Sequence, residues 1–115
     1  MDVIAGYRQA QQHLADRDAA AARPLLERVL AEVPGDRSAM RLLALARFGT
    51  EDLAGAETLL REVVEADPVD ADAHALLGEV LAADGRHSDA ASERAIAARL
   101  SPRYSASCDV WGRTR

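Results

Sequence analysis

The spacing of the prolines constrains the fold of this chain most strongly. Pro34, Pro68 and Pro102 lie 34 residues apart, twice in succession, and only Pro24 falls outside the pattern. Other residues keep the same step in several separate series, namely Ala5, Ala39 and Ala73; Ala22, Ala56 and Ala90; Leu26 and Leu60; Val29 and Val63; Asp36 and Asp70; and Leu43 and Leu77. Because these matches share one register, we expect a structural repeat of 34 residues.

Each period has the pattern of two short helices. In the second period, Met40, Leu43 and Phe48 follow helical spacing, and Asp36 stands before them as an N-cap. The second helix of a period ends near a proline, which cannot continue it. The segments predicted to hold helices are 3–15, 18–32, 36–48, 52–68, 71–84 and 85–102. Pro24 falls inside the second of them and predicts a kink or a late helix start.

The composition favours helices throughout. Hydrophobic residues make up 49% of the 115 residues, enough for the core of one domain, and alanine and leucine supply most of them. Strand formers are sparse, since Val63 and Val64 form one of only two adjacent β-branched pairs in the sequence, and aromatic residues are only 3%. The predicted fold class is therefore all-α.

The repeat resembles the tetratricopeptide repeat (TPR) family. The third period matches best, with Leu77, Gly78, Gly85, Ala90, Ala97 and Pro102 at family positions. The second has Glu51 where the inter-helix glycine is usual, the first has Gln9 where leucine is expected, and Arg94 replaces a large apolar residue of the third. The resemblance covers residues 3–102. It implies a right-handed α-solenoid of three antiparallel helix hairpins at 3–36, 37–70 and 71–104, with the last helix ending near residue 100 and a tail over 103–115.

Sites for small ligands are not indicated. Gly78 and Gly85 do not form a phosphate loop, which needs clustered glycines and usually a lysine, and this chain has no lysine. We expect them to serve helix packing and an inter-helix turn. His13, His74 and His87 lack metal-ligand spacing, and His74 is expected to be a partly buried packing residue. With no catalytic motif either, we predict neither an enzyme nor a cofactor or metal.

The charge distribution and the lack of targeting signals limit the partners and the cellular compartment that we expect. The net charge is −5, and between Glu51 and Asp89 eleven acidic residues stand against Arg61 and Arg86, which argues against a nucleic-acid groove there. We expect no signal peptide, because residues 1–12 hold no apolar run long enough for one, and no apolar run is long enough for a membrane span. Cys108 is the only cysteine. We expect a cytoplasmic protein, and the arginine-only basic residues suggest a high-GC, bacterial source.

The resemblance also implies a partner-binding groove along the first helix of each hairpin. Its lining would be Tyr7, Gln11, Arg41, Leu45, Phe48, Asp72, Ala75 and Glu79. Arg41 flanked by Leu45 and Phe48 would suit a peptide with apolar side chains. The carboxylate clamp of chaperone cofactors is absent, because its positions hold Tyr7, Gln11, Leu42, Asp72 and Leu76, and Asp72 would repel a carboxylate.

The tail and the end of the repeat array leave two functions open. Tyr104 and Trp111, with nearby arginines, form either a frayed end or a segment that docks in an acidic groove of its own or a neighbouring chain. The first function is a non-catalytic protein–protein interaction module that binds a peptide or partner segment in the groove. The alternative is a self-associating scaffold subunit whose last repeat and tail contact another copy.

Overall fold

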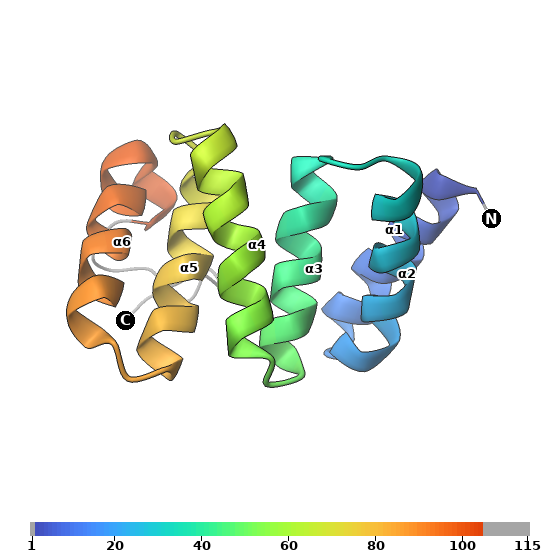
Figure 1. Cartoon of the computed structure of the whole chain (residues 1–115), viewed down its shortest axis with the longest axis horizontal. Helices are drawn as coiled ribbons and strands as arrows, with labels where there is room; N and C mark the ends of the chain where they lie inside the picture. Colours follow the sequence, from blue (N-terminus) through green and yellow to red (C-terminus); the bar gives the residue numbers. More distant parts are fainter. Residues whose placement is uncertain (1, 105–115) are drawn as a thin grey trace. The chain divides into compact units, whose positions relative to one another are not determined.

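The computed structural model describes residues 2–104, and among them only helices are formed (Figure 1). The elements are α1 (Val3–Ala15), α2 (Ala19–Glu32), α3 (Arg37–Gly49), α4 (Leu53–Ala66), α5 (Ala71–Ala83), α6 (His87–Leu100) and the short 3₁₀ helix η1 (Pro102–Tyr104). Every predicted helix is present, and the all-α fold of helix hairpins is confirmed. No helix in this part of the chain is long and apolar enough to cross a membrane.

Aspartates begin the first helix of each hairpin. Asp2, Asp36 and Asp70 stand 34 residues apart, and each carboxylate accepts a hydrogen bond from a backbone N–H of the following helix. The N-terminal N–H groups of a helix have no partner within the helix, so such a cap stabilises its first turn. The predicted cap at Asp36 is confirmed, and Asp70 caps α5 in the same way.

A second series of caps begins two of the second helices. Asp18 accepts from the N–H of Ala21 at 3.2 Å, and Asp52 accepts from the N–H of Gly55 at 3.0 Å. The third member of the series is Arg86, which makes no side-chain cap. The third hairpin therefore starts its second helix without this stabilisation.

The turn inside each hairpin contains one residue in the left-handed region. These residues are Arg17 with φ 61°, Glu51 with φ 65° and Gly85 with φ 83°, again at 34-residue spacing. Left-handed backbone strains any residue that has a Cβ atom, and glycine avoids this cost. Gly85 thus serves the turn, as expected. The first and second hairpins hold the same conformation with Arg17 and Glu51, which are less suited to it.

Of the kink or late start predicted for the second helix at Pro24, the late start is wrong, and a kink stays a prediction. α2 begins at Ala19 and continues through Pro24 to Glu32. The carboxylate of Asp18 caps this helix at its N-terminus, and Ala22, Leu26 and Val29 are buried along it. The cap at Asp18 and the burial of the apolar residues therefore set the start of α2. Together they outweigh the tendency of proline to disrupt a helix interior.

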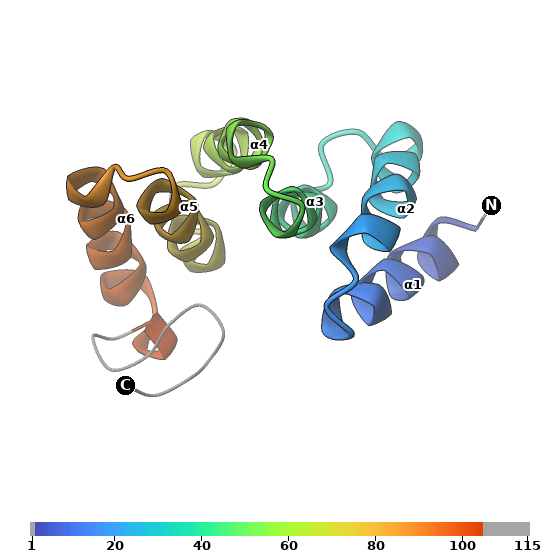
Figure 2. The same cartoon turned by 90° about the horizontal axis from the view of Figure 1, so that it is seen from below.

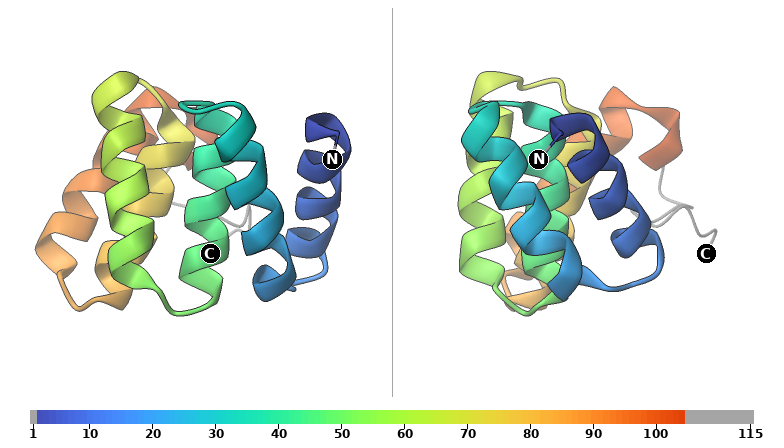
Figure 3. Two further views of the ribbon diagram at one scale, coloured as in Figure 1. Left: turned by 45° about the vertical axis from the view of Figure 1, so that its right-hand side comes forward. Right: turned by 90° about the vertical axis from the view of Figure 1, so that its right-hand side faces the viewer.

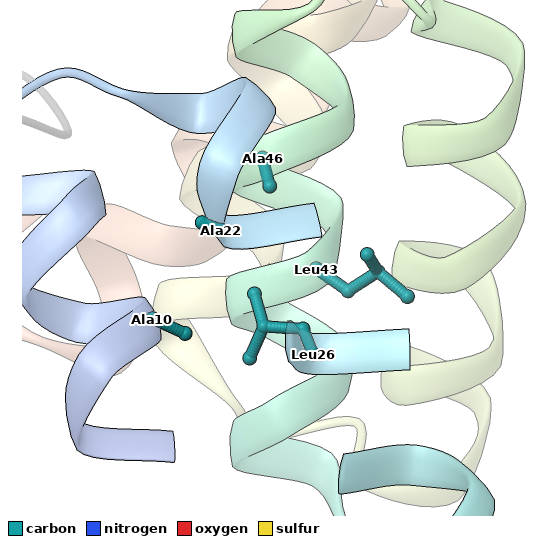
Figure 4. Close-up of a cluster of buried hydrophobic side chains, with 5 residues drawn as sticks. All are labelled: Ala10, Ala22, Leu26, Leu43 and Ala46. Atoms are coloured by element: carbon teal, nitrogen blue, oxygen red, sulfur yellow. The ribbon is translucent and has the colours of Figure 1, made fainter. Parts of the chain in front are cut away.

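The chain forms two compact units, Met1–Leu59 and Leu60–Arg115. In the first unit, α2 lies between α1 and α3 (Figure 3). Its core joins side chains from all three helices, with alanines where the helices approach closely and leucines filling the space between them. The core residues are Ala10, Ala22, Leu26, Leu43 and Ala46 (Figure 4).

In the second unit, α5 and α6 lie side by side (Figures 1 and 2). Leu77, Val80 and Leu81 of α5 are fully buried. Gly78 lets the two helices approach, because a Cβ atom there would lie 3.0 Å from Cγ of Arg94 and 3.3 Å from the carbonyl oxygen of Ala90. This confirms the expected packing role of Gly78.

Candidate partner-binding surface

The first unit has an open hollow along α1. Its volume is about 380 Å³, and α1 lines it with residues spaced at three and four positions, which therefore share one face. The end of α2 and the start of α3 complete the wall. The lining residues are Val3, Ile4, Tyr7, Arg8, Gln11, Val29, Asp36 and Ser38.

Ile4 is the main apolar feature of this hollow. Its residue surface is 62% exposed, although an isoleucine on a helix would ordinarily be turned toward a core. Val29 at the same hollow is 1% exposed and belongs to the packed interior, and Tyr7 is half-buried. The hollow thus combines an accessible apolar side chain with a phenol, and polar groups surround them.

The polar groups come from both α1 and α3. Arg8 and Gln11 stand on α1, while Ser38 of α3 accepts a hydrogen bond from the Arg41 guanidinium at 3.4 Å. Asp36 lines the hollow with the carboxylate that also caps α3. The lining therefore combines charge of both signs with apolar side chains, which suits a peptide that carries both apolar and polar side chains.

The structure brings some of the expected groove residues together. Tyr7 and Gln11 share the hollow, and Arg41 is joined to it through Ser38. Leu45 and Phe48 are half-buried further along α3 and do not line it.

In the second unit, the expected residues are engaged within the chain. Asp72 accepts a hydrogen bond from the Tyr104 hydroxyl, and Ala75 packs against the same tyrosine. Glu79 lies 3.4 Å from the guanidinium of Arg94 on α6. Tyr104 is buried on α5, whereas Trp111, the other expected tail contact, lies outside the described residues.

The sequence prediction missed Ile4, Arg8 and Ser38. The 34-residue register contains a signal for two of them, because positions 4 and 38 correspond to Asp72, which was expected in the groove. Arg8 follows from the helical spacing to Ile4 and Gln11. Residues 2–104 contain no group of three or more histidine, cysteine or acidic side chains arranged to hold a metal ion.

Comparison with protein families finds one whose model matches this chain. The family model described as "Tetratricopeptide repeat" matches residues 13–80, more than half of the chain. This span includes part of each unit and contains most of the expected groove positions. No curated protein sequence matches the chain.

Solved structures give a consistent result. A structure described as "MamA RS-1 ArsTM double mutant" is 31% identical, with a TM-score of 0.78 over 85% of this chain and 55% of that one. "MamA 41-end from Desulfovibrio magneticus RS-1" is 31% identical with the same TM-score, over 84% and 55% of the two chains. "Crystal structure of MamA" is 18% identical with a TM-score of 0.80, over 90% and 64%, and supports the fold alone. The chain spans little more than half the length of the first two.

Proposed function

The chain belongs to the tetratricopeptide repeat family, and we propose that it is a non-catalytic module that binds a peptide segment of a protein partner. The binding surface is the hollow of the first unit together with Arg41, Leu45 and Phe48 on α3. In unit two, Asp72 and Glu79 are the corresponding proposed positions on α5. The family and the similar solved structures support a protein–protein interaction module.

The observation that carries this proposal is the exposure of Ile4, one of the residues that line the hollow. An apolar side chain that is 62% exposed gains free energy when a partner covers it. Tyr7 beside it adds a flat apolar surface with a hydroxyl, a combination that is enriched at protein interfaces. We therefore expect the bound segment to place an apolar side chain against Ile4 and Tyr7.

A photo-cross-linker at defined positions tests the surface directly. Benzoylphenylalanine replaces Ile4 in one variant and Glu62, an exposed residue of α4, in a control variant. After irradiation in cells, mass spectrometry identifies the protein joined to position 4. A partner captured from position 62 as often as from position 4 would contradict the surface.

Binding of the identified partner is then measured by calorimetry with purified proteins. We expect Ile4→Asp and Arg41→Glu each to weaken it by about tenfold or more, since hot-spot losses exceed 1.4 kcal/mol. Glu62→Arg, which also alters charge on an exposed helix surface, should leave the affinity unchanged. Undiminished binding by Ile4→Asp would remove the hollow as the site.

Self-association through the last repeat and tail is the second candidate. α6 exposes Ile96 and Leu100, at 39% and 38%, one helical turn apart. A second copy that covers this pair would remove apolar surface from water. Light scattering at increasing concentration measures the mass of the full chain and of the Ile96→Asp/Leu100→Asp variant. A mass that rises with concentration in the first and stays monomeric in the second supports this alternative.

We also propose that the chain is not catalytic, that it binds neither nucleic acid nor membranes, and that it lies in the cytoplasm. The family supports the first, and the excess of acidic residues in the middle of the chain supports the absence of nucleic-acid binding.

A further inference from the structure

The turn after α6 returns onto α5 and covers part of it. η1 follows directly from the end of α6 (Figure 2), and its Tyr104 is only 8% exposed. The ring packs against Ala75 and Ala97, both buried, with Ala71 beside them. These three alanines form a shelf of small side chains, which leaves room for an aromatic ring.

One carboxylate serves both residues at the end of this turn. Asp72 accepts a hydrogen bond from the hydroxyl of Tyr104, and the same oxygen lies 3.9 Å from the Arg103 guanidinium. The guanidinium carbon also lies 5.5 Å from the centre of the tyrosine ring, within cation–π range. Tyr104 therefore occupies the shelf, and Arg103 lies beside it near the same carboxylate.

We propose that this shelf, Ala71, Asp72, Ala75 and Ala97, recognises segments of partner proteins in which tyrosine follows arginine. The chain's own turn is then an intramolecular occupant that a partner segment has to displace. This proposal rests on the proposed interaction function, but it concerns a surface of the second unit alone.

The chemistry of the shelf selects for both residues of such a segment. The tyrosine ring fills the space above the alanines, and its hydroxyl reaches a carboxylate, which forms stronger hydrogen bonds than a neutral acceptor. Arginine supplies the opposite charge to Asp72. A phosphorylated tyrosine would bring negative charge against this carboxylate and be rejected.

A partner segment has to compete with the turn, because the turn is covalently attached to the end of α6. A covalently attached segment competes at an effective concentration in the millimolar range or above, so a free peptide binds the intact chain weakly. Removing the tyrosine side chain from the turn would open the shelf. The free peptide should then bind more tightly, although the variant has lost a contact of its own.

The probe is a peptide amide with the sequence Ser-Pro-Arg-Tyr, as at positions 101–104 of the chain. It is titrated into the full-length chain, and the amide NMR signals of Ala71, Asp72 and Ala75 report binding. We expect Tyr104→Ala to bind it about tenfold more tightly than the unaltered chain, because the competitor has been removed. Equal or weaker binding by a folded Tyr104→Ala chain would overturn the proposal.

Further variants separate recognition from non-specific adhesion. In the Tyr104→Ala background, Asp72→Asn should weaken peptide binding about tenfold, since it removes a charged acceptor. Asp89→Asn, a matched change at an exposed acid of α6, should have no effect. Peptides with phenylalanine or phosphotyrosine in place of tyrosine should bind less tightly than the parent peptide, and equal binding by either would count against the proposal.

If Tyr104→Ala fails to fold, Tyr104→Phe provides the same test in milder form. Phenylalanine retains the packing on the alanines but cannot donate to Asp72, so the peptide should bind more tightly than to the unaltered chain. The cross-linking experiment at position 4 probes the other unit. A negative peptide titration with a positive cross-link would therefore reject the shelf and leave the proposed function intact.

Discussion

His74 and Glu93 join α5 to α6 through a contact of 2.6 Å between Nδ1 of the imidazole and the carboxylate. The other ring nitrogen, Nε2, lies 2.8 Å from the carbonyl oxygen of Pro68. A carbonyl oxygen can only accept, so Nε2 donates to Pro68, while Nδ1 faces the carboxylate of Glu93. His74 is only 7% exposed. The packing histidine that was expected to be partly buried is thus buried, and it also connects the two helices of the last hairpin.

Replacing Glu93 should destabilise the second unit. Glu93→Ala leaves a buried ring nitrogen of His74 without its partner, and the expected loss is about 1–3 kcal/mol in the free energy of unfolding. Urea unfolding followed by circular dichroism measures it. The control Glu62→Ala removes an exposed carboxylate from α4 and should change the free energy by less than about 0.5 kcal/mol. Equal effects of the two changes would show that the contact contributes nothing.

Glycine should stabilise the turn at Glu51. This residue has φ 65°, whereas its counterpart in the third hairpin, Gly85, has no Cβ atom to strain. Relief of left-handed strain is about 1–2 kcal/mol, and the greater freedom of glycine in the unfolded chain offsets part of it. Glu51→Gly should therefore raise the unfolding free energy by about 0.5–1 kcal/mol.

The same substitution inside a helix provides the control. Glu62→Gly in α4 should lower the unfolding free energy by about 1 kcal/mol, because glycine is a poor helix former. Opposite signs for the two glutamate-to-glycine changes are the expected result. Destabilisation by both would show that Glu51 is not strained.

Gly49 and Ala19 form a close approach between α3 and α2. A Cβ atom built at Gly49 would lie 2.7 Å from Cβ of Ala19, which is closer than two non-bonded carbon atoms approach without strain. Gly49→Ala should therefore destabilise the first unit by about 1–3 kcal/mol, even though alanine is the better helix former.

A double variant tests the origin of that loss. Ala19→Gly removes the atom that the new methyl group would meet, so it should restore much of the stability of Gly49→Ala. Thermal and urea unfolding of the parent, the two single variants and the double variant complete the cycle. Strictly additive effects would mean that the two positions do not contact each other.

A large side chain at position 78 should disrupt the last hairpin. Gly78 is buried, and the nearby carbonyl oxygen of Ala90 belongs to the backbone and cannot move aside easily. Gly78→Leu should cost at least about 1–3 kcal/mol through overpacking. Ala83→Leu, at an exposed position of the same helix, should change stability by less than about 0.5 kcal/mol. A Gly78→Leu chain as stable as the parent would refute the packing role.

The sequence by itself determined the helices and their order. Asp36 and Asp70 cap helices, and Pro68 and Pro102 follow helix ends, because capping and chain termination depend on groups within a few residues of one another. The 34-residue step then placed Gly85 in a turn and Gly78 at a helix contact. Of the kink or late start predicted at Pro24, the late start failed because capping at Asp18 and burial along α2 outweighed the local preference of the proline.

Only the tertiary structure decided which side chains meet and which remain accessible. The contact of His74 with Glu93, the approach of Ala19 to Gly49, and the burial of Tyr104 on α5 each join different elements. Their distances depend on how the helices pack. The exposure of Ile4 has the same origin, since the helical pattern gives the side a residue faces but not whether another helix covers that side.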